Sequence, residues 1–213
     1  MVEVQANGFG FEKWVRDSFF SAYTGNYMQE WDVPAQFNAG NLVPAEFWHL
    51  PVSIKSAKVG SPIGLGDVLR QYRIDESFLM ITGFWEQRTK TEKWFIDIGV
   101  AKFTPQIWHG LWGQLALADL TALDAMVKNR GEHYTVVRTK AKVWKKTFVA
   151  TKGDIVINPK IDSKDQRRVQ CSLPYNKFWE LAGRAPVRCD RPEFWGHVFP
   201  NPVKLPARTF NQS

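Results

Sequence analysis

The first apolar residues of the chain recur at helical spacing. Within Gly8–Ala22, Phe11, Val15 and Phe19 follow one another at intervals of four, and the charged Glu12 lies beside them. Residues at this spacing return to the same side of an α-helix. The pattern therefore predicts an amphipathic helix, with Glu12 at the edge of its apolar stripe.

Two strand-like runs follow this helix. Tyr27–Val33 predicts a strand, 35–51 is loop-like, and Val52–Ala57 predicts a second strand. Strand side chains alternate in direction, so Ser53 and Lys55 are expected on one face and the apolar positions between them on the other. The second strand can thus present a lysine to a site.

The remaining patterns alternate between helix and strand. In chain order they predict a glycine-rich turn over Gly60–Gly66, a helix over Asp67–Arg73, a hairpin of Phe78–Trp85 and Trp94–Phe103, a helix over Ile107–Lys128, strands over Tyr134–Ala150, Asp154–Ile161 and Val169–Leu173, and a helix over Tyr175–Ala182. The fold class is therefore α/β, with a mixed central sheet flanked by helices. We expect one domain over 1–183 and a proline-rich arm without regular structure over 184–213.

Composition and charge narrow the function. The chain has 213 residues, 44% of them hydrophobic, which is enough for a packed core. Its 28 Lys and Arg against 21 Asp and Glu give a net charge of +7. A basic excess favours a polyanionic partner, nucleic acid first and an anionic membrane surface second.

Several classes of protein are disfavoured. The N-terminus has no secretory signal pattern, so we expect a cytoplasmic protein. The apolar run Leu111–Val127 contains Asp119 and Asp124, which argues against a membrane span. Cys171 and Cys189 form no CxxC pair, so reduced structural thiols are expected.

Asp32 and Lys55 are the main candidates for chemistry. Burying an ammonium group is costly unless an opposite charge pairs with it. Asp32 lies at the end of the strand that precedes Lys55 and is the obvious partner. We therefore predict a half-buried catalytic pair.

The order of these features resembles the PD-(D/E)XK nuclease superfamily, most of all type II restriction endonucleases. In that superfamily an aspartate and a second acid hold Mg²⁺, and a lysine two positions after the second acid orients or activates the attacking water. The resemblance implies a restriction endonuclease-like core over 1–105, with DNA-contacting and dimerisation elements over 106–183. It also implies that Asp32 is the first acid, that Lys55 is the lysine and that Ile54 is among the metal ligands.

The sequence departs from that pattern at two positions. Trp31 precedes Asp32 where proline is usual, and Ser53 occupies the position of the second acid. Some restriction endonucleases of the superfamily carry serine there and recruit an acid from the helix after the lysine strand, which implies Asp67 as the second metal ligand. Glu12 resembles a first-helix glutamate that reaches the metal directly or through water.

A structural alternative accounts for the same residues without catalysis. Asp32 can simply end a strand, Lys55 can extend its amine to solvent from an edge, and Asp67 can cap a helix. The sequence leaves this alternative open.

Basic residues suggest two surfaces for DNA. On the strand predicted over Tyr134–Ala150, one face would carry Arg138, Lys140, Lys142, Trp144 and Lys146. That face fits a phosphate backbone, or is an ordinary solvated strand face. The later run 158–170 supplies residues of the types that pair with base edges in the major groove, or forms a charged loop. These residues are Lys160, Lys164, Gln166, Arg167, Arg168 and Gln170.

The glycines of Gly60–Gly66 invite comparison with phosphate-binding loops. They match neither a P-loop nor GxGxxG, so no nucleotide cofactor is expected. The stretch is predicted to be a structural turn, or a loop that touches a DNA backbone together with Lys58.

These inferences predict a Mg²⁺-dependent type II restriction endonuclease that cuts double-stranded DNA at a short sequence, as a homodimer. Two alternatives remain open. One is a structure-selective nuclease, such as a junction resolvase or repair nuclease. The other is a non-catalytic DNA-binding protein with a nuclease-like core, which Ser53 in place of the acid would explain.

Overall fold

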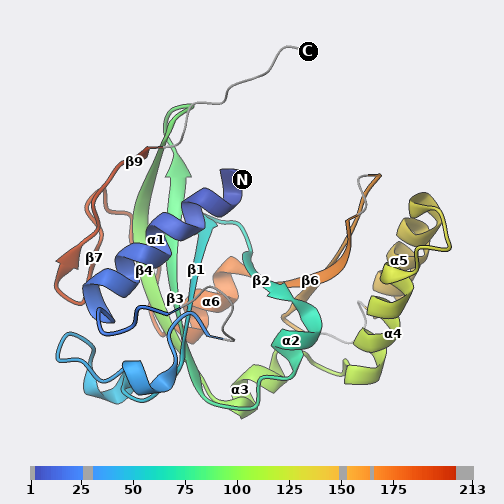
Figure 1. The fold of residues 1–213 in the computed structure, drawn as a ribbon, viewed down its shortest axis with the longest axis horizontal. Helices are drawn as coiled ribbons and strands as arrows, with labels where there is room; N and C mark the ends of the chain where they lie inside the picture. Colours follow the sequence, from blue (N-terminus) through green and yellow to red (C-terminus); the bar gives the residue numbers. More distant parts are fainter. Residues whose placement is uncertain (1–2, 26–30, 149–152, 164–165, 205–213) are drawn as a thin grey trace. The chain divides into compact units, whose positions relative to one another are not determined.

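The chain forms two compact units, each with its own β-sheet and helices (Figure 1). This computed structural model describes residues 3–25, 31–148, 153–163 and 166–204. Unit 1 contains the described residues of 1–61, 77–102 and 178–213, and unit 2 those of 62–76 and 103–177. The predicted α/β class is confirmed, whereas the domain boundaries drawn from the sequence stay predictions.

The sheet of unit 1 has four strands. In spatial order they are β1 (Val52–Lys58), β3 (Phe78–Gln87), β4 (Glu92–Phe103) and β9 (Val203–Lys204). β1 and β3 are parallel, with Ile54 beside Ile81, and β9 is antiparallel to β4, so the sheet is mixed as predicted. The predicted hairpin is also confirmed, since β3 and β4 are neighbours joined by a short turn.

The C-terminal segment contains more regular structure than its composition predicts. Besides β9, it forms a small hairpin of β7 (Glu193–Phe194) and β8 (His197–Val198). Proline cannot donate to a β-ladder, but Pro192, Pro200 and Pro202 all lie outside the paired positions. The expectation of an irregular arm was therefore wrong for these short strands.

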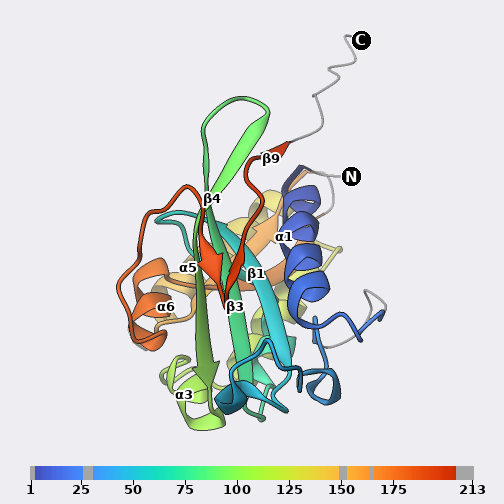
Figure 2. The same ribbon diagram turned by 90° about the vertical axis from the view of Figure 1, so that its left-hand side faces the viewer.

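Helices cover both faces of the unit 1 sheet. α1 (Glu3–Phe19) lies on one face and α6 (Tyr175–Leu181) on the other (Figure 2). The predicted apolar stripe of α1 is confirmed, because Phe11, Val15 and Phe19 are buried. Two short 3-10 helices, Ala35–Phe37 and Ala45–Phe47, precede β1 in the chain.

Two glycines allow these helices to approach the sheet closely. A Cβ atom at Gly83 of β3 would lie 2.6 Å from the Phe11 ring. On the other face, a Cβ at Gly99 of β4 would lie 2.6 Å from Trp179 and 2.7 Å from Phe178. Gly83 therefore sets how near α1, and with it Glu12, comes to the sheet.

Unit 2 is built on a three-stranded antiparallel sheet. Its strands, in spatial order, are β2 (Ile63–Asp67), β6 (Arg167–Leu173) and β5 (Val156–Ile161). Its helices are α2 (Val68–Tyr72), α3 (Pro105–Gly110), α4 (Leu117–Lys128) and α5 (Tyr134–Phe148). Part of the predicted glycine-rich turn is strand β2, because Ile63 and Leu65 alternate into the core.

The single helix predicted over Ile107–Lys128 is wrong. Gly113 adopts a φ of +62°, a left-handed conformation that ends helical structure after α3. α4 then begins with its own N-terminal capping contact, in which the Asp119 carboxylate accepts a hydrogen bond from the backbone N–H of Ala116 at 3.0 Å. The apolar content of the segment concealed this break.

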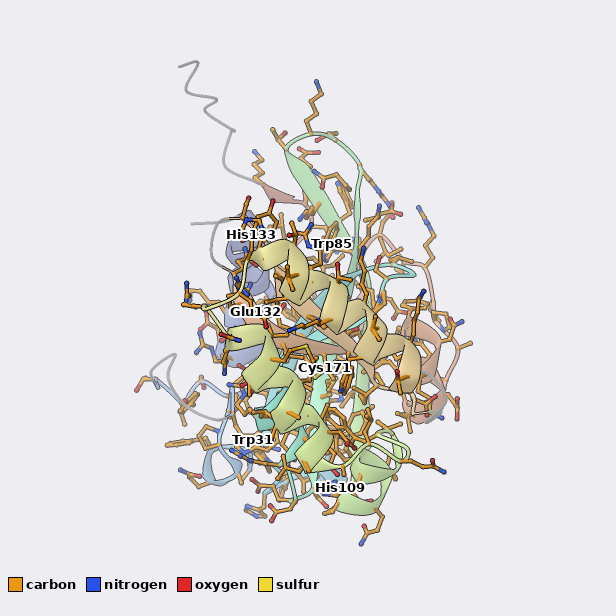
Figure 3. All side chains as sticks on the ribbon, turned by 90° about the vertical axis from the view of Figure 1, so that its right-hand side faces the viewer. Trp31, Trp85, His109, Glu132, His133 and Cys171 are labelled. Carbon is orange, nitrogen blue, oxygen red and sulfur yellow. The ribbon has the colours of Figure 1, made fainter. Side chains whose placement is uncertain are left out.

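The strand predicted over Tyr134–Ala150 is also wrong over its described residues, which form α5. The β-branched residues near its start suggested a strand, but burial follows a helical period, with Val137 and Ala141 both inside. Figure 3 shows Glu132 and His133 at the turn between α4 and α5. The expected face of Arg138, Lys140, Lys142, Trp144 and Lys146 therefore does not exist, because alternate residues diverge around a helix.

Two tryptophans and a cysteine lie in the core of unit 2, and both cysteines are free thiols. Trp108 and Trp112 are buried in unit 2, and Trp108 donates to the Gln71 carbonyl at 2.8 Å. Cys171 is a buried and Cys189 an exposed free thiol. Within the described ranges, every helix is too short or too polar to cross a bilayer.

Replacing Gly83 by alanine should destabilise unit 1. The new methyl group meets a buried aromatic ring, and overpacking of this kind costs about 1–3 kcal/mol. Chemical denaturation should show the loss in Gly83→Ala. The matched strand variant Gly64→Ala, whose Cβ would have no heavy atom within 4 Å, should stay close to wild type. Equal stability of both variants would contradict the close packing of α1.

Candidate active site

A short backbone bridge brings Asp32 to the start of β1. Val33 and Val52 exchange two hydrogen bonds, of 3.1 and 2.8 Å between N and O. Asn38, which is fully buried, fixes the following loop by donating to the carbonyls of Phe47 and Leu50. The predicted strand over Tyr27–Val33 lies mostly outside the described residues.

The Asp32 carboxylate is bound by three consecutive residues of β1. Its Oδ2 atom accepts the backbone N–H of Ile54 at 2.6 Å and the Nζ of Lys55 at 3.0 Å. The hydroxyl of Ser53 lies 3.5 Å from the same oxygen. Ser53 and Lys55 therefore share a face, as predicted, while Ile54 packs in the core.

Lys55 is held at two of its three donor positions. Besides Asp32, its Nζ donates to the Ile54 carbonyl at 3.1 Å. An ammonium group has three N–H donors, so among the described residues one donor is left for another acceptor. The side chains of Lys55 and Asp32 are 18% and 27% exposed, which makes the predicted half-buried pair accessible from solvent.

Glu12 of α1 belongs to the same electrostatic cluster. Burial raises the pKa of its carboxyl, the charge of Asp32 raises it further, and Arg16 and Lys55 partly oppose this rise. The Arg16 guanidinium lies 3.6 Å from the Glu12 carboxylate, one helical turn away. Sequence reasoning missed Arg16, although its spacing of four from Glu12 on a predicted helix was a usable signal.

Asp67, which the resemblance implied as the second metal ligand, is a helix-capping residue in the structure. It belongs to unit 2, where its carboxylate accepts the Arg70 backbone N–H at 2.9 Å and caps α2. The structural alternative is confirmed for this residue as far as its helix-capping contact goes. A role for Asp67 as a metal ligand stays a prediction.

The oxygen atoms at and near Asp32 are of the type that binds a hard cation. Mg²⁺ is bound in proteins by one or two carboxylates while it keeps several waters. Asp32 and Glu12 supply two carboxylates, and Ile54, whose side chain is hydrocarbon, has only its backbone carbonyl to offer. The described residues contain no group of three His, Cys, Asp or Glu side chains, but such a group is not required for a largely hydrated Mg²⁺.

The basic and amide side chains expected to contact DNA fall into two sets. Three of them hold unit 2 together: Arg138 donates to the Ile161 carbonyl, Lys140 pairs with Glu132, and Arg167 donates to the carbonyls of Asn129 and Glu132. The others are exposed or half-buried, and the described part of the chain gives them no ion pair. They are Lys58, Lys142, Lys160, Gln166, Arg168 and Gln170. Lys164 lies outside the described residues.

Scans of the chain against protein-family models, curated proteins and solved structures found no match. The functional assignment of this cluster therefore rests on its own chemistry. Two carboxylates and two cations converge at one end of β1, where three successive residues bind a single carboxylate oxygen.

The raised pKa of Glu12 predicts a stabilising substitution. A carboxyl whose pKa is higher in the folded than in the unfolded protein contributes a stabilisation that is fully present below its ordinary pKa, here 4.5. This stabilisation is lost as the pH rises through the raised pKa of the folded protein. Glu12→Gln, which stays neutral, should therefore melt at a higher temperature than wild type near neutral pH. The difference should shrink towards about pH 4.

Thermal melts across this pH range would test the effect. Glu46→Gln, at an exposed position of unit 1, is the matched control and should melt like wild type at each pH. A Glu12→Gln variant that is less stable than wild type at neutral pH would contradict the electrostatic description of the cluster.

Proposed function

We propose that the protein is a Mg²⁺-dependent nuclease that hydrolyses phosphodiester bonds of double-stranded DNA. The observation that carries the proposal is the 3.0 Å contact between the Lys55 amine and the Asp32 carboxylate, in a half-buried position beside Glu12. The net charge of +7 supports a polyanionic substrate.

Phosphodiester hydrolysis places negative charge on the phosphate and on the leaving oxygen. Fixed positive charge near these atoms is the main way in which a protein stabilises such a transition state. Asp32, Glu12 and the Ile54 carbonyl would hold Mg²⁺, which when bound supplies that charge and makes a coordinated water more acidic. The half-buried position strengthens these interactions relative to water.

Lys55 would position the attacking water or a phosphate oxygen. Two of its N–H donors are committed to Asp32 and to the Ile54 carbonyl, so the direction of the third is restricted. Fixing a catalytic group in this way lowers the entropy lost on reaching the transition state. The ammonium group also adds positive charge where the phosphate would lie.

Ser53 gives the proposed site an unusual charge balance. A serine hydroxyl cannot supply the second negative charge, and Glu12 is a carboxylate whose titration responds to the charge of Asp32. We therefore assign Glu12 the role of second metal-binding acid. A two-fold homodimer remains the simplest arrangement for cutting both strands of a symmetric site, and site-specific cleavage is part of the same proposal.

Ser53 in place of an acid also supports an alternative function, that of a DNA-binding protein without cleavage activity. The two functions share DNA affinity and differ in cleavage. Salt-sensitive binding without Mg²⁺-dependent cleavage would decide for this alternative.

Digestion of plasmid DNA tests the nuclease proposal. Wild type should give discrete fragments with Mg²⁺ and none with chelator. Asp32→Asn and Lys55→Ala should each lower the cleavage rate by at least about 100-fold, the usual cost of losing a charged group that acts in the transition state. The exposed pair Lys13 and Asp17 on α1 provides matched controls.

Lys13→Ala and Asp17→Asn make the same chemical changes in an exposed ion pair, and both variants should cleave like wild type. Undiminished cleavage by both Asp32→Asn and Lys55→Ala would remove the site assignment. Absence of cleavage by folded wild type on linear, supercoiled and branched DNA would remove the activity.

Mg²⁺ binding can be measured separately from cleavage. A ligand that binds only the folded state stabilises it by about 2.7 kcal/mol at 100 times its Kd. MgCl₂ should therefore raise the melting temperature of wild type and of Asp17→Asn above that in NaCl of equal ionic strength. The melting temperature of Asp32→Asn should not rise with MgCl₂. If it rises as much as that of wild type, the cation binds elsewhere.

A further inference from the structure

The outer part of β5 and β6 is a two-stranded ribbon. β2 pairs with β6 only from Gln170 onwards, so Arg167–Val169 pair with Pro159–Ile161 of β5 alone. These are the two orange strands that run side by side in Figure 1. The ribbon is therefore narrower than the sheet from which it extends.

The two faces of this ribbon differ in chemistry. On one face Ile161 and Val169 are buried, and Arg167 turns its guanidinium to the carbonyls of Asn129 and Glu132. On the other face Lys160 and Arg168 are directly opposite each other and both are exposed. Gln170, half-buried, is two residues from Arg168 and so shares that face.

The facing cations lower the stability of the ribbon. Like charges opposite each other in an antiparallel pair are unfavourable. The described part of the chain provides no carboxylate that forms an ion pair with Lys160 or Arg168, whereas Arg138 and Arg167 nearby each donate to backbone carbonyls. Two uncompensated cations and an amide on a projecting ribbon indicate a surface for an external acceptor.

Duplex DNA offers acceptors of the right kind and a groove of the right width. Its major groove is about 12 Å wide and admits a two-stranded β-ribbon. Arg and Lys donate to O6 and N7 of guanine, and Gln forms two hydrogen bonds with N6 and N7 of adenine. The major groove of duplex RNA is too narrow and deep for such contacts.

We propose that the β5–β6 ribbon reads base pairs in the major groove of duplex DNA through Lys160, Arg168 and Gln170. These residues determine which sequence the protein prefers, and the phosphate backbone supplies sequence-independent affinity. The proposal deepens the nuclease function, on which it rests for its biological purpose, but the recognition step itself requires no cleavage.

A binding selection tests the ribbon without using cleavage as its readout. The probe is a pool of duplex DNA with a randomised central segment, selected in Mg²⁺ with Lys55→Ala as the background of every variant. The background protein should enrich a defined motif. Arg168→Ala and Lys160→Ala should lose preference at guanine positions and Gln170→Ala at adenine positions, each by about 5- to 150-fold.

Lys142→Ala is the matched control, because Lys142 is an exposed lysine of unit 2 that belongs to α5 and to neither strand of the ribbon. It should enrich the unaltered motif, even if its affinity falls. Thermal melts would verify that all variants are folded.

Four results would overturn the proposal: no enriched motif, an unaltered motif in all three ribbon variants, an equal alteration in Lys142→Ala, or duplex RNA competing as well as DNA. The outcome is independent of the plasmid digest. A motif that depends on the ribbon, from a protein that never cuts, would leave the ribbon proposal standing and remove the nuclease. Cleavage by wild type, together with an unaltered motif in the ribbon variants, would support the nuclease proposal and remove the ribbon proposal.

Discussion

The candidate site depends on one carboxylate oxygen, Oδ2 of Asp32, and on the strand that surrounds it with donors. β1 presents the backbone N–H of Ile54 and the amine of Lys55 to this oxygen within 3.0 Å. The arrangement follows from alternation along the strand. Val52 and Ile54 are anchored in the hydrophobic core, which directs Ser53 and Lys55 to the opposite side. Packing of hydrocarbon side chains thus determines the positions of the charged ones.

A second constraint brings Glu12 to this site at a cost in stability. Gly83 lets the Phe11 ring lie against β3, and the next residue of α1 places a carboxyl in a partly buried position near the charge of Asp32. Burial and like charge both raise the pKa of that carboxyl. Groups held in unfavourable electrostatic surroundings are concentrated at functional sites, where a ligand relieves the strain. In the proposed function, the bound Mg²⁺ would relieve it.

The sequence predicted those parts of the molecule that depend on short periods. Phe11, Val15 and Phe19 predicted α1, the alternation around Lys55 predicted the face it shares with Ser53, and the cost of burying an ammonium group predicted its pairing with Asp32. Features that depend on tertiary packing or on distant hydrogen-bond partners could not be predicted from the sequence. The β-branched residues of α5 favour a strand in isolation, and only packing of Val137 and Ala141 selects the helix. Arg167 is bound by carbonyls more than 30 positions away in sequence, and no local pattern records such partners.

The parallel pairing of β1 with β3 has a consequence for biosynthesis. β3 begins at Phe78, so a growing polypeptide cannot complete the sheet that orients Lys55 until that segment has left the ribosome. A slip of β1 by one position would turn the amine inward and expose the hydrocarbon beside it. Unfinished or misaligned molecules therefore lack the assembled charge pair. The charge pair is thus a property of the finished sheet, and it forms only once folding of unit 1 has succeeded.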